Sequence, residues 1–517
     1  MKRTIYLLAF LWAFIGHLNA QFDMEVKFGE TEKWSLPNQA FKLESGQFLY
    51  VKTKIGFSGK VFFDLLDEQM NLIKSEESNV IYKNKFGEGK LFRSVESWGG
   101  KLYLFYSINK DVYSYKVFAE EIDQSTLKLS GDPILIGNFE KKGWQDFGWM
   151  RITRSNDGKR MILYLRENVK MESERKTEHI QLVMLDEALQ VIWQKSLLRP
   201  APTKRSVYLD VAVNKAGEAF VLEQLTAGER DKKKGTDPDY SYILHKFDNR
   251  GAKRLARDLE LGDRKTLRLD LGMTLDEDLL VNGIFNDEAN GNGIVYMRLN
   301  TLALKEQVIA FNHFDLEYIT QGYSKEKGEA LNLPITVREW IPRPDGGLLL
   351  LGERFKTRST SSSTGAPSTS FSFDEIFIIK LDAKGDIVWN KKIMKKQKFS
   401  ESLSRSSPLL GRFKYASFCW AIQDGNIILL FNDNRSNVAF DKDIKEVKMT
   451  PYNLDSYLNA VRIDENGDME REQMFKSADY KVAIYPACSR PLNKQRSEFV
   501  LIGINKNKQR LAHLKIN

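Results

Sequence analysis

The chain has 517 residues, of which 42% are hydrophobic and 11% aromatic, and its formal net charge is +9. This composition supplies enough apolar side chains for a packed core and excludes disorder over most of the length. The positive charge favours an acidic partner, such as an anionic glycan or a membrane surface, unless the Lys and Arg residues are simply scattered over a solvated surface.

Residues 1–20 have the pattern of a secretion signal. Lys2 and Arg3 form a basic start, and the apolar run Ile5–Ile15 that follows is too short to span a bilayer. Ala20 provides a small residue at the expected cleavage point. We therefore expect export to the periplasm or the cell exterior, with a retained membrane anchor as the alternative.

The mature chain is expected to be a single domain, residues 21–517. Because Lys2 and Arg3 leave with the signal, its formal charge would be +7. No later stretch is long and apolar enough to be read as a membrane span. Export argues against nucleic acid as a partner, and we expect a monomer.

The repeated feature of this domain is an apolar alternating run that ends in Asp or Asn. Between these runs there is no convincing pattern with the period of a helix, which disfavours βαβ units. Four-strand units that recur in this way are typical of β-propeller blades, and the longer spacings then contain inserted loops. The runs end at Asp67, Asp123, Asp186, Asp248, Asn300, Asp382, Asp464 and Asn517.

We name the four strands of each unit a, b, c and d, with c as the run that ends at the anchor. Short turns such as Asp345-Gly346 and Asp424-Gly425 join several a and b strands, because glycine supplies the positive φ of narrow hairpins. The expected b strands are Gln47–Lys54, Leu102–Ser107, Arg160–Arg166, Ala219–Leu225, Leu279–Phe285, Leu348–Arg354, Ile427–Asn432 and Glu498–Ile504.

The last unit reaches only its c strand, which ends at Asn517. A spare strand lies within Phe22–Leu36, before the first a strand near Ala40–Leu43. We predict that this N-terminal strand completes the C-terminal blade and closes the ring, which removes two exposed sheet edges. The predicted fold is an all-β propeller of eight four-stranded blades, with seven blades as the alternative.

The best-formed unit runs from Pro344 to Ile393. It contains Asp345-Gly346-Gly347, a Leu-rich b strand, and Lys380-Leu381-Asp382 followed by Gly385 and Trp389. This repeat resembles that of secreted bacterial β-propellers, in which a DGG hairpin precedes a K-L-D-x-x-G-x-x-x-W hairpin. The resemblance implies blade geometry and brings no catalytic residue with it. We expect Trp389 to be buried.

The insertions fall between b and c strands or between d and a strands, which meet at one rim of a propeller. Long loops on one face of a rigid scaffold usually carry function, although neutral surface drift also lengthens loops. Ser359–Ser372 is almost wholly Ser, Thr, Gly and Pro and is expected to be a flexible flap. The other insertions are Glu167–Thr177, Gly228–Asp239, Leu316–Pro334, Lys395–Lys414 and Arg435–Tyr452.

Six residues are candidates for ligand binding. Trp144 and Trp149 fall in one d–a connection, where aromatic side chains could stack on sugars or peptides, or could cement two blades together. The other candidates lie on a strands, which line the channel of a propeller, together with Arg93, Asp210 and Asp270; ion pairs between blades are the alternative role for such charges. These candidates are Arg151, Arg338, Trp340 and Trp420.

Catalysis has little support in the sequence, and neither a cofactor nor a metal is predicted. The histidines of the mature chain lack metal-ligand spacing, and G-x-S-x-G, P-loop and CxxC motifs are absent. The leading hypothesis is a non-enzymatic exported propeller that binds a protein or a glycan through its loop-rich face. The alternatives are a polysaccharide-acting enzyme, a hydrolase or lyase, and a structural module of an envelope assembly.

The two cysteines, Cys419 and Cys488, fall in corresponding strands of neighbouring units. A disulfide is possible in an oxidising compartment, but a strands of neighbouring blades are not hydrogen-bonded to each other, and their Cα atoms could exceed the ~7 Å limit for a bridge. The alternative is two buried free thiols.

Overall fold

A computed structural model describes most of the chain from residue 22 onward. The residues outside the description are 1–21, 34, 54–58, 82–88, 112–113, 141–148, 167–178, 199–204, 228–238, 263, 288–290, 323–334, 361–367, 403–414, 441–444, 452–453, 494–495 and 507. The predicted signal sequence therefore lies outside the described residues. Of the helices in the described part, none has the length and apolar character needed to cross a bilayer.

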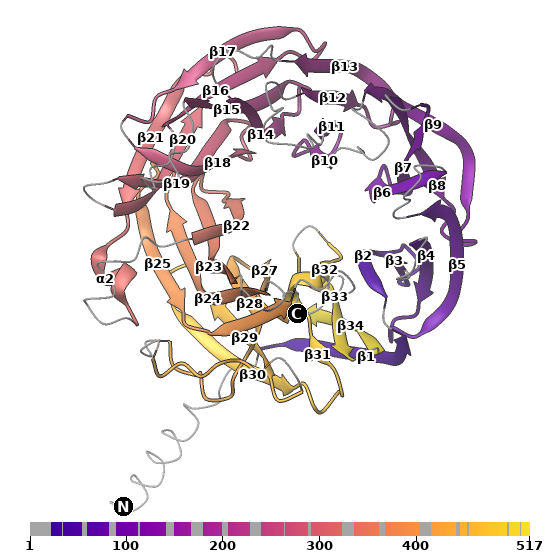
Figure 1. Ribbon diagram of the computed structural model, residues 1–517, viewed down its shortest axis with the longest axis vertical. Helices are drawn as coiled ribbons and strands as arrows, with labels where there is room; N and C mark the ends of the chain where they lie inside the picture. The colour runs from indigo at the N-terminus through magenta and orange to yellow at the C-terminus, as the bar shows by residue number, and fades with distance from the viewer. Residues whose placement is uncertain are drawn as a thin grey trace, which may run out of the picture.

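The fold is built from antiparallel sheets, and its 34 described strands form four-stranded meanders. Figure 1 shows these sheets following one another around a ring; in the meanders of β2–β25 and β27–β30 the first strand lies nearest the middle and the fourth at the periphery. Two meanders are joined into one eight-stranded sheet, because β5 and β6 pair in parallel through Val80↔Lys90 and Ile81↔Leu91. The prediction of an all-β chain without βαβ units is confirmed.

The strands of the first half of the chain are grouped by sheet. The eight-stranded sheet contains β2 (Leu36–Lys42), β3 (Phe48–Thr53), β4 (Lys60–Leu66), β5 (Leu72–Ile81), β6 (Lys90–Trp98), β7 (Lys101–Asn109), β8 (Ser114–Ile122) and β9 (Leu129–Glu140). The next two sheets contain β10 (Trp149–Arg154), β11 (Met161–Arg166), β12 (His179–Leu185) and β13 (Val191–Leu198), then β14 (Arg205–Val213), β15 (Ala219–Ala227), β16 (Asp239–Phe247) and β17 (Lys253–Leu259).

The second half follows the same order. Its first three sheets contain β18 (Lys265–Met273), β19 (Leu279–Asp287), β20 (Gly291–Leu299) and β21 (Glu306–His313); β22 (Ile335–Pro342), β23 (Leu348–Thr360), β24 (Ser368–Leu381), β25 (Ile387–Ile393) and β26 (Gln397–Ser402); and β27 (Cys419–Gln423), β28 (Asn426–Asp433), β29 (Tyr457–Ile463) and β30 (Met469–Lys476). The last contains β1 (Met24–Lys33), β31 (Ala483–Ile484), β32 (Arg490–Pro491), β33 (Glu498–Asn505) and β34 (Lys508–Ile516). The short helices are α2 (Leu316–Thr320) and η3 (Pro486–Cys488).

Burial follows the position of a strand in its sheet. β3 is buried at every residue, because apolar side chains on both of its faces pack against neighbouring strands. β5, the fourth strand, alternates between exposed and less exposed residues along most of its length. A central strand covered on both faces favours a continuous apolar run, whereas a peripheral strand favours alternation. Each of the eight predicted b strands coincides with a buried second or central strand, so this prediction is confirmed.

The repeated Asp or Asn closes the turn between the c and d strands. Asp382 Oδ1 accepts the backbone N–H groups of Lys384 and Asp386, at 2.8 and 2.9 Å. Asp464 Oδ1 accepts those of Asn466 and Asp468 in the same way. Side chains of Asp and Asn satisfy turn N–H groups readily, which explains why only these residues recur at the anchors.

A second position of this turn has a left-handed backbone. Gly385 has φ 84°, and an added Cβ would lie 2.6 Å from Tyr296 on the neighbouring sheet. Leu189 and Leu304 hold the corresponding place with φ 58° and 54°, and both are fully buried. The left-handed conformation costs roughly 1–2 kcal/mol without glycine, which burial of a leucine, worth about 1.5–3 kcal/mol, offsets. The turn therefore keeps its left-handed geometry in units whose sequence has lost the glycine.

The N-terminal strand pairs with the last strand, as predicted. β1 runs antiparallel to β34, from Met24↔Ile516 to Lys33↔Lys508. The backbone N–H of Asn517 donates to the carbonyl of Asp23 at 2.9 Å, beyond the end of the ladder. The first and last described segments are therefore held in one sheet (Figure 1).

Three expectations from the sequence differ from the described structure. At its two ends, residues 359–360 and 368–372, the predicted flap Ser359–Ser372 continues β23 and β24, and β26 pairs with the extended part of β24; residues 361–367 lie outside the described residues. Trp389 is half-buried, because it lies on the peripheral strand β25 against Gly467 of the next sheet. Cys488 lies in η3 and not in a strand that corresponds to that of Cys419; both cysteines are buried, and no disulfide joins them.

Candidate binding site on the inner strands

The first strands of the sheets carry charged residues at one shared position. The turn that follows each first strand gives a common reference point. Its first residue donates its backbone N–H to the carbonyl four or five residues later, and these first residues are Ser155, Asn214, Thr274 and Arg343. Residues that lie four places before them therefore occupy equivalent positions on their strands. On β10, β14, β18 and β22 these residues are Arg151, Asp210, Asp270 and Glu339.

Asp210 connects three of these strands. Its Oδ1 lies 2.5 Å from Arg151 Nη1 on β10, and its Oδ2 accepts the backbone N–H of Leu271 on β18 at 2.9 Å. Only 2% of the Asp210 side chain is exposed, compared with 41% for Arg151. Burial raises the pKa of the Asp210 carboxyl, while Arg151 opposes that shift.

Asp270 makes the next connection. Its Oδ2 accepts a hydrogen bond from Trp340 Nε1 on β22 at 3.1 Å, and its Oδ1 accepts one from Arg268 Nε at 2.8 Å. The indole ring of Trp340 is thereby held between two sheets. Arg268 keeps 57% of its side chain exposed and is available to solvent beside the pair.

Glu339 lies among charges from several sheets. Burial raises the pKa of its carboxyl, nearby Arg496 and Arg151 lower it, and Asp270 raises it. Among the described residues, no group donates a hydrogen bond to the Glu339 carboxylate. Arg496 comes from the loop before β33, and burial lowers its pKa, while Glu339 opposes that shift.

Arg496 also stacks on an aromatic ring. Its guanidinium carbon lies 3.9 Å from the centroid of the Trp420 ring on β27. A guanidinium over an indole face is a favourable cation–π contact that keeps both groups in a fixed orientation. Consecutive sheets therefore bring together carboxylates, guanidinium groups and two indole rings near their inner strands. We call these residues the inner set: Arg151, Asp210, Asp270, Glu339, Trp340, Trp420 and Arg496.

The predicted site residues divide into three groups. Arg151, Trp340 and Trp420 belong to this inner set. Trp144 lies outside the described residues, and Trp149 is described only as the first residue of β10. Arg338 belongs to a different cluster, because two of its guanidinium nitrogens donate to Glu353 Oε2, at 3.1 and 2.7 Å.

A β-bulge explains the direction of Arg338. The pairing of β22 with β23 passes from Val337↔Gly352 to Glu339↔Leu351, which leaves Arg338 as the extra residue. An extra residue disturbs the strict alternation of faces along a strand. Arg93 is the extra residue of a similar bulge on β6, and its Nε donates to Ser107 Oγ at 3.0 Å.

The cluster around Glu353 is structural in character. Lys395 Nζ lies 2.6 Å from Glu353 Oε1, and Ser417 Oγ donates to Glu353 Oε2 at 2.7 Å. Burial alone would raise the pKa of Glu353, but Lys395 and Arg338 hold it below its ordinary value. Glu353 and Lys395 are fully buried, and Ser417 belongs to the segment that enters the next sheet. The cluster therefore fastens two sheets together.

Two members of the inner set, Glu339 and Arg496, were not singled out from the sequence at all. Glu339 lies four residues before the turn at Arg343, as Arg151, Asp210 and Asp270 lie before theirs, so a comparison of turn positions would have found it. Arg496 follows no repeat position, because it comes from an irregular loop with φ 58°. Only the contacts of the folded chain reveal it.

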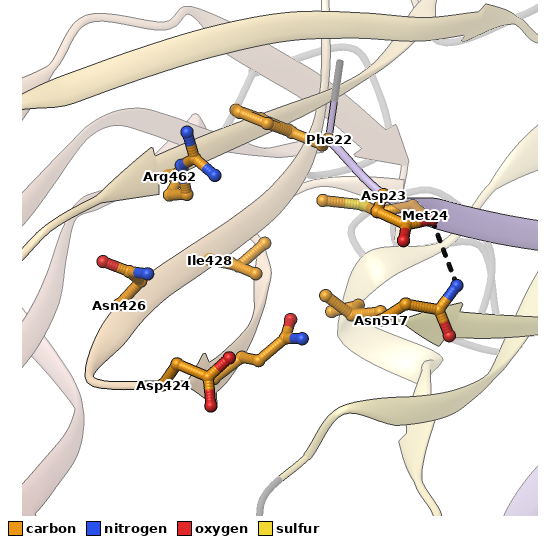
Figure 2. Close-up of a pocket in the computed structure, with 10 residues that line it drawn as sticks. Phe22, Asp23, Met24, Asp424, Asn426, Ile428, Arg462 and Asn517 are labelled. Atoms are coloured by element: carbon orange, nitrogen blue, oxygen red, sulfur yellow. Dashed lines mark hydrogen bonds between the residues drawn. The ribbon is translucent and has the colours of Figure 1, made fainter. Parts of the chain in front are cut away.

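A small pocket lies at the seam between the β27–β30 sheet and the sheet that holds β1. Figure 2 shows Arg462 beside Phe22, and Asp424 and Asn426 opposite Asn517. Its volume is about 100 Å³, which is room for a few water molecules only. We regard it as part of the seam and not as a binding site for a large ligand.

Among the described residues, no group of three or more His, Cys, Asp or Glu side chains has the geometry of a metal site. His245 instead contacts Glu223, with Nε2 and Oε2 2.7 Å apart and both residues buried.

No family model and no curated protein matches the chain. Solved structures align with it at low similarity. A protein of unknown function from Bacteroides caccae is 13% identical, with 65% of this chain and 92% of that chain covered and a TM-score of 0.27. An alpha-L-arabinanase of Penicillium chrysogenum in complex with arabinobiose is 12% identical, with 62% and 88% covered and a TM-score of 0.28.

A third alignment covers more of the chain. A Glu150Gln mutant of the Synechocystis apocarotenoid oxygenase is 11% identical, with 96% of this chain and 94% of that chain covered and a TM-score of 0.32. At TM-scores this low, the alignments support neither a fold nor a function. The description of the fold therefore stands on the strand pairing within this chain.

Proposed function

We propose that the sheets form an eight-bladed β-propeller closed by β1. Support comes from the seven meanders of strands β2–β25 and β27–β30, together with the composite sheet in which β1 pairs with β34. Residues 1–20 would be removed as a secretion signal, and residues 21–517 would form one exported domain. Mass spectrometry of the protein recovered from an exporting host tests the cleavage after Ala20.

We further propose that this propeller binds a saccharide at the inner set of residues. The observation that carries the proposal is the Glu339 carboxylate, which has no hydrogen-bond donor among the described residues and whose charge interacts with those of Arg496, Arg151 and Asp270. Carboxylates and guanidinium groups bind the hydroxyl groups of sugars, and indole rings stack on sugar faces. Each of these groups is already held by the sheets, which lowers the cost of ordering them on binding.

A polysaccharide-acting enzyme is the second candidate. Asp270 and Glu339 lie close enough for their charges to interact, and burial raises the pKa of Glu339 above that of an ordinary glutamate. Glycoside hydrolysis usually uses two carboxyl groups, one of which acts as the acid because its pKa is raised. A structural role in an envelope assembly would require neither binding nor catalysis at this position.

The test compares variants of the mature protein on an array of neutral and acidic glycans. Glu339→Gln and Trp420→Ala should each weaken binding by about tenfold or more, if each removes a direct contact worth ~1.4 kcal/mol. Trp389→Ala, at a half-buried tryptophan on β25, is the matched control and should bind like the wild type. Equal binding by all four proteins would exclude the inner set as the site.

Product analysis separates the two candidates. Release of shorter saccharides by the wild type but not by Glu339→Gln would establish the enzyme. Binding without release of products would establish the binding protein.

A further inference from the structure

The hairpin of β23 and β24 is much longer than the other hairpins of the fold. Arg354 pairs with Ile335, the first residue of β22. Beyond Arg354 the hairpin continues without β22, through Lys356↔Ser372 and Arg358↔Ser370. β26 pairs with the far side of this extension, through Ser372↔Lys398 and Ser370↔Ser400. The extension is therefore a small three-stranded sheet at the b–c end of the unit.

One face of this small sheet is apolar and packed. The ring centroids of Phe355 and Phe373 lie 4.8 Å apart, and Phe371 stacks on Phe355 at 6.4 Å. Phe399 of β26 contacts Tyr415 on the same side at 6.1 Å. Phe373, Phe399 and Tyr415 are buried, so this face anchors the extension to the fold.

The other face follows from alternation along the strands. Residues directly opposite each other on paired strands point to the same side of a sheet, and so do residues two apart on one strand. Lys356, Ser372 and Lys398 therefore form one row across the three strands, and Arg358 and Ser370 lie in the next row. Lys356, Arg358 and Lys398 are all exposed.

Three other cations near the extension each pair with a carboxylate. Arg338 and Lys395 pair with Glu353, and Arg354 pairs with Glu375 at 2.9 Å. Among the described residues, no ion pair is made by Lys356, Arg358 or Lys398. The nearest carboxylate in the strand order is Asp374, at the foot of the extension next to Phe373.

We propose that this basic face, Lys356, Arg358, Lys398, Ser370 and Ser372, binds an anionic polysaccharide. Neighbouring rows lie about 7 Å apart and the outer strands about 10 Å apart, so the cations form an extended grid, not a closed pocket. An extended grid of cations and hydroxyl groups suits a chain with repeated carboxylate or sulfate groups.

A protein partner fits this face less well. The central contacts of protein interfaces are usually aromatic or apolar side chains in desolvated pockets. Here the aromatic side chains lie on the opposite, packed face, and the outer face has only charged and hydroxyl groups. The proposal concerns a surface separate from the inner strands and does not require a ligand there.

The experiment measures binding of the mature protein to polygalacturonate, to dextran sulfate and to polyglutamate, with unsulfated dextran as the neutral control, in low salt and at 0.5 M salt. The basic-face variant is Lys356→Gln/Arg358→Gln/Lys398→Gln. The matched control is Lys159→Gln/Arg250→Gln/Lys384→Gln, which removes the same number of exposed Lys and Arg side chains from turns that lie outside the extension. Circular dichroism is used to check that both variants are folded.

The wild type and the matched control should bind at least one of the polyanions in low salt, and high salt should weaken that binding. The basic-face variant should bind at least about tenfold more weakly, since three exposed charge contacts of up to ~1 kcal/mol each are lost. Equal losses in the two variants would overturn the proposal in favour of net charge alone. Binding of polyglutamate but of neither polysaccharide would also overturn it, in favour of an acidic protein segment.

Glu339→Gln is included to keep the two sites apart. Loss of polyanion binding in Glu339→Gln, with no loss in the basic-face variant, would assign the polyanion to the inner strands and overturn the basic face. Loss in the basic-face variant alone supports the basic face whether or not the inner set binds a saccharide.

Discussion

Arg151 Nη1 lies 2.5 Å from Asp210 Oδ1, and the two residues occupy the same position on consecutive inner strands. The repeat therefore places an acid opposite a base across a sheet boundary. Asp210 continues the connection to Leu271 on the following strand. Contacts of this kind hold neighbouring sheets together near the middle of the ring, where backbone hydrogen bonds between the sheets are few.

Replacement of Asp210 by Ala should lower the free energy of unfolding by about 1–3 kcal/mol, because the Leu271 N–H loses its buried acceptor and Arg151 loses its partner. Urea denaturation followed by tryptophan fluorescence measures the change. Asp276→Ala, at an exposed turn residue, is the control and should stay within about 0.5 kcal/mol of the wild type. A similar effect of both substitutions would contradict the assigned role of Asp210.

Asp374 should make stability depend on pH. Burial, with a smaller effect of Glu375, raises the pKa of Asp374 to about 6. The ordinary pKa of the carboxyl is 3.8, so the folded state favours the protonated form. Its contribution to stability is complete below about pH 3.8 and disappears as the pH rises through about 6.

Asp374→Asn removes this dependence, because the amide does not ionise. The variant should therefore be more stable than the wild type by about 1–3 kcal/mol at pH 7.5, and the difference should shrink toward pH 4.5. Thermal denaturation at several pH values gives the comparison. A constant difference between the two proteins over this range would show that Asp374 titrates normally.

A comparison of Gly158 with Gly385 distinguishes the cost of a strained backbone from the cost of a steric clash. Gly385 and Gly158 both have positive φ, but an added Cβ at Gly158 meets no heavy atom within 4 Å. At Gly385 the added Cβ would lie 2.6 Å from Tyr296 and 2.8 Å from Ala310. Gly158→Ala should cost about 1–2 kcal/mol and Gly385→Ala about 1–3 kcal/mol more, measured by urea denaturation. Equal costs would mean that the turn at Gly385 can move away from the neighbouring sheet.

The strand pattern could be predicted because it depends on local chemistry. Alternating apolar runs, Asp anchors such as Asp382 and narrow turns such as Asp345-Gly346 are each determined by a few adjacent residues. The pairing of β1 with β34 could be inferred because the last unit had only three strands. Arg338 was predicted as a binding residue of an inner strand, together with Trp340, but a bulge interrupts β22 at Arg338 and its guanidinium pairs with Glu353 instead.

The inner set was only partly predictable for a related reason. Arg151 lies on a strand without a bulge, and Trp340 lies beyond the bulge at Arg338, so the positions of both followed from the repeat. Arg496 comes from an irregular loop, and its contact with Trp420 depends on the packing of two sheets. The extension of β23 and β24 was missed because Ser and Thr in Ser359–Ser372 suggested a flexible loop, although Phe371 and Phe373 give that stretch an apolar face.

The pairing of β1 with β34 allows a sharp test of closure. Val26 of β1 packs against the apolar core of the last sheet, opposite Leu514. Its neighbour Lys27, opposite His513, keeps 41% of its side chain exposed. Val26→Asp places a charge in that core and should lower Tm by more than about 5 °C, whereas Lys27→Asp should change Tm by less than about 2 °C.

Deletion of residues 21–36 extends the same test, because it removes β1 and uncovers one edge of β34 together with part of its core. The deleted protein should melt at least as early as Val26→Asp, and it should associate in size-exclusion chromatography, since an exposed strand edge pairs with other chains. A wild-type Tm for the deleted protein would show that β1 does not close the ring. A large drop for Val26→Asp and Lys27→Asp alike would point to local charge and not to the packed face of the strand.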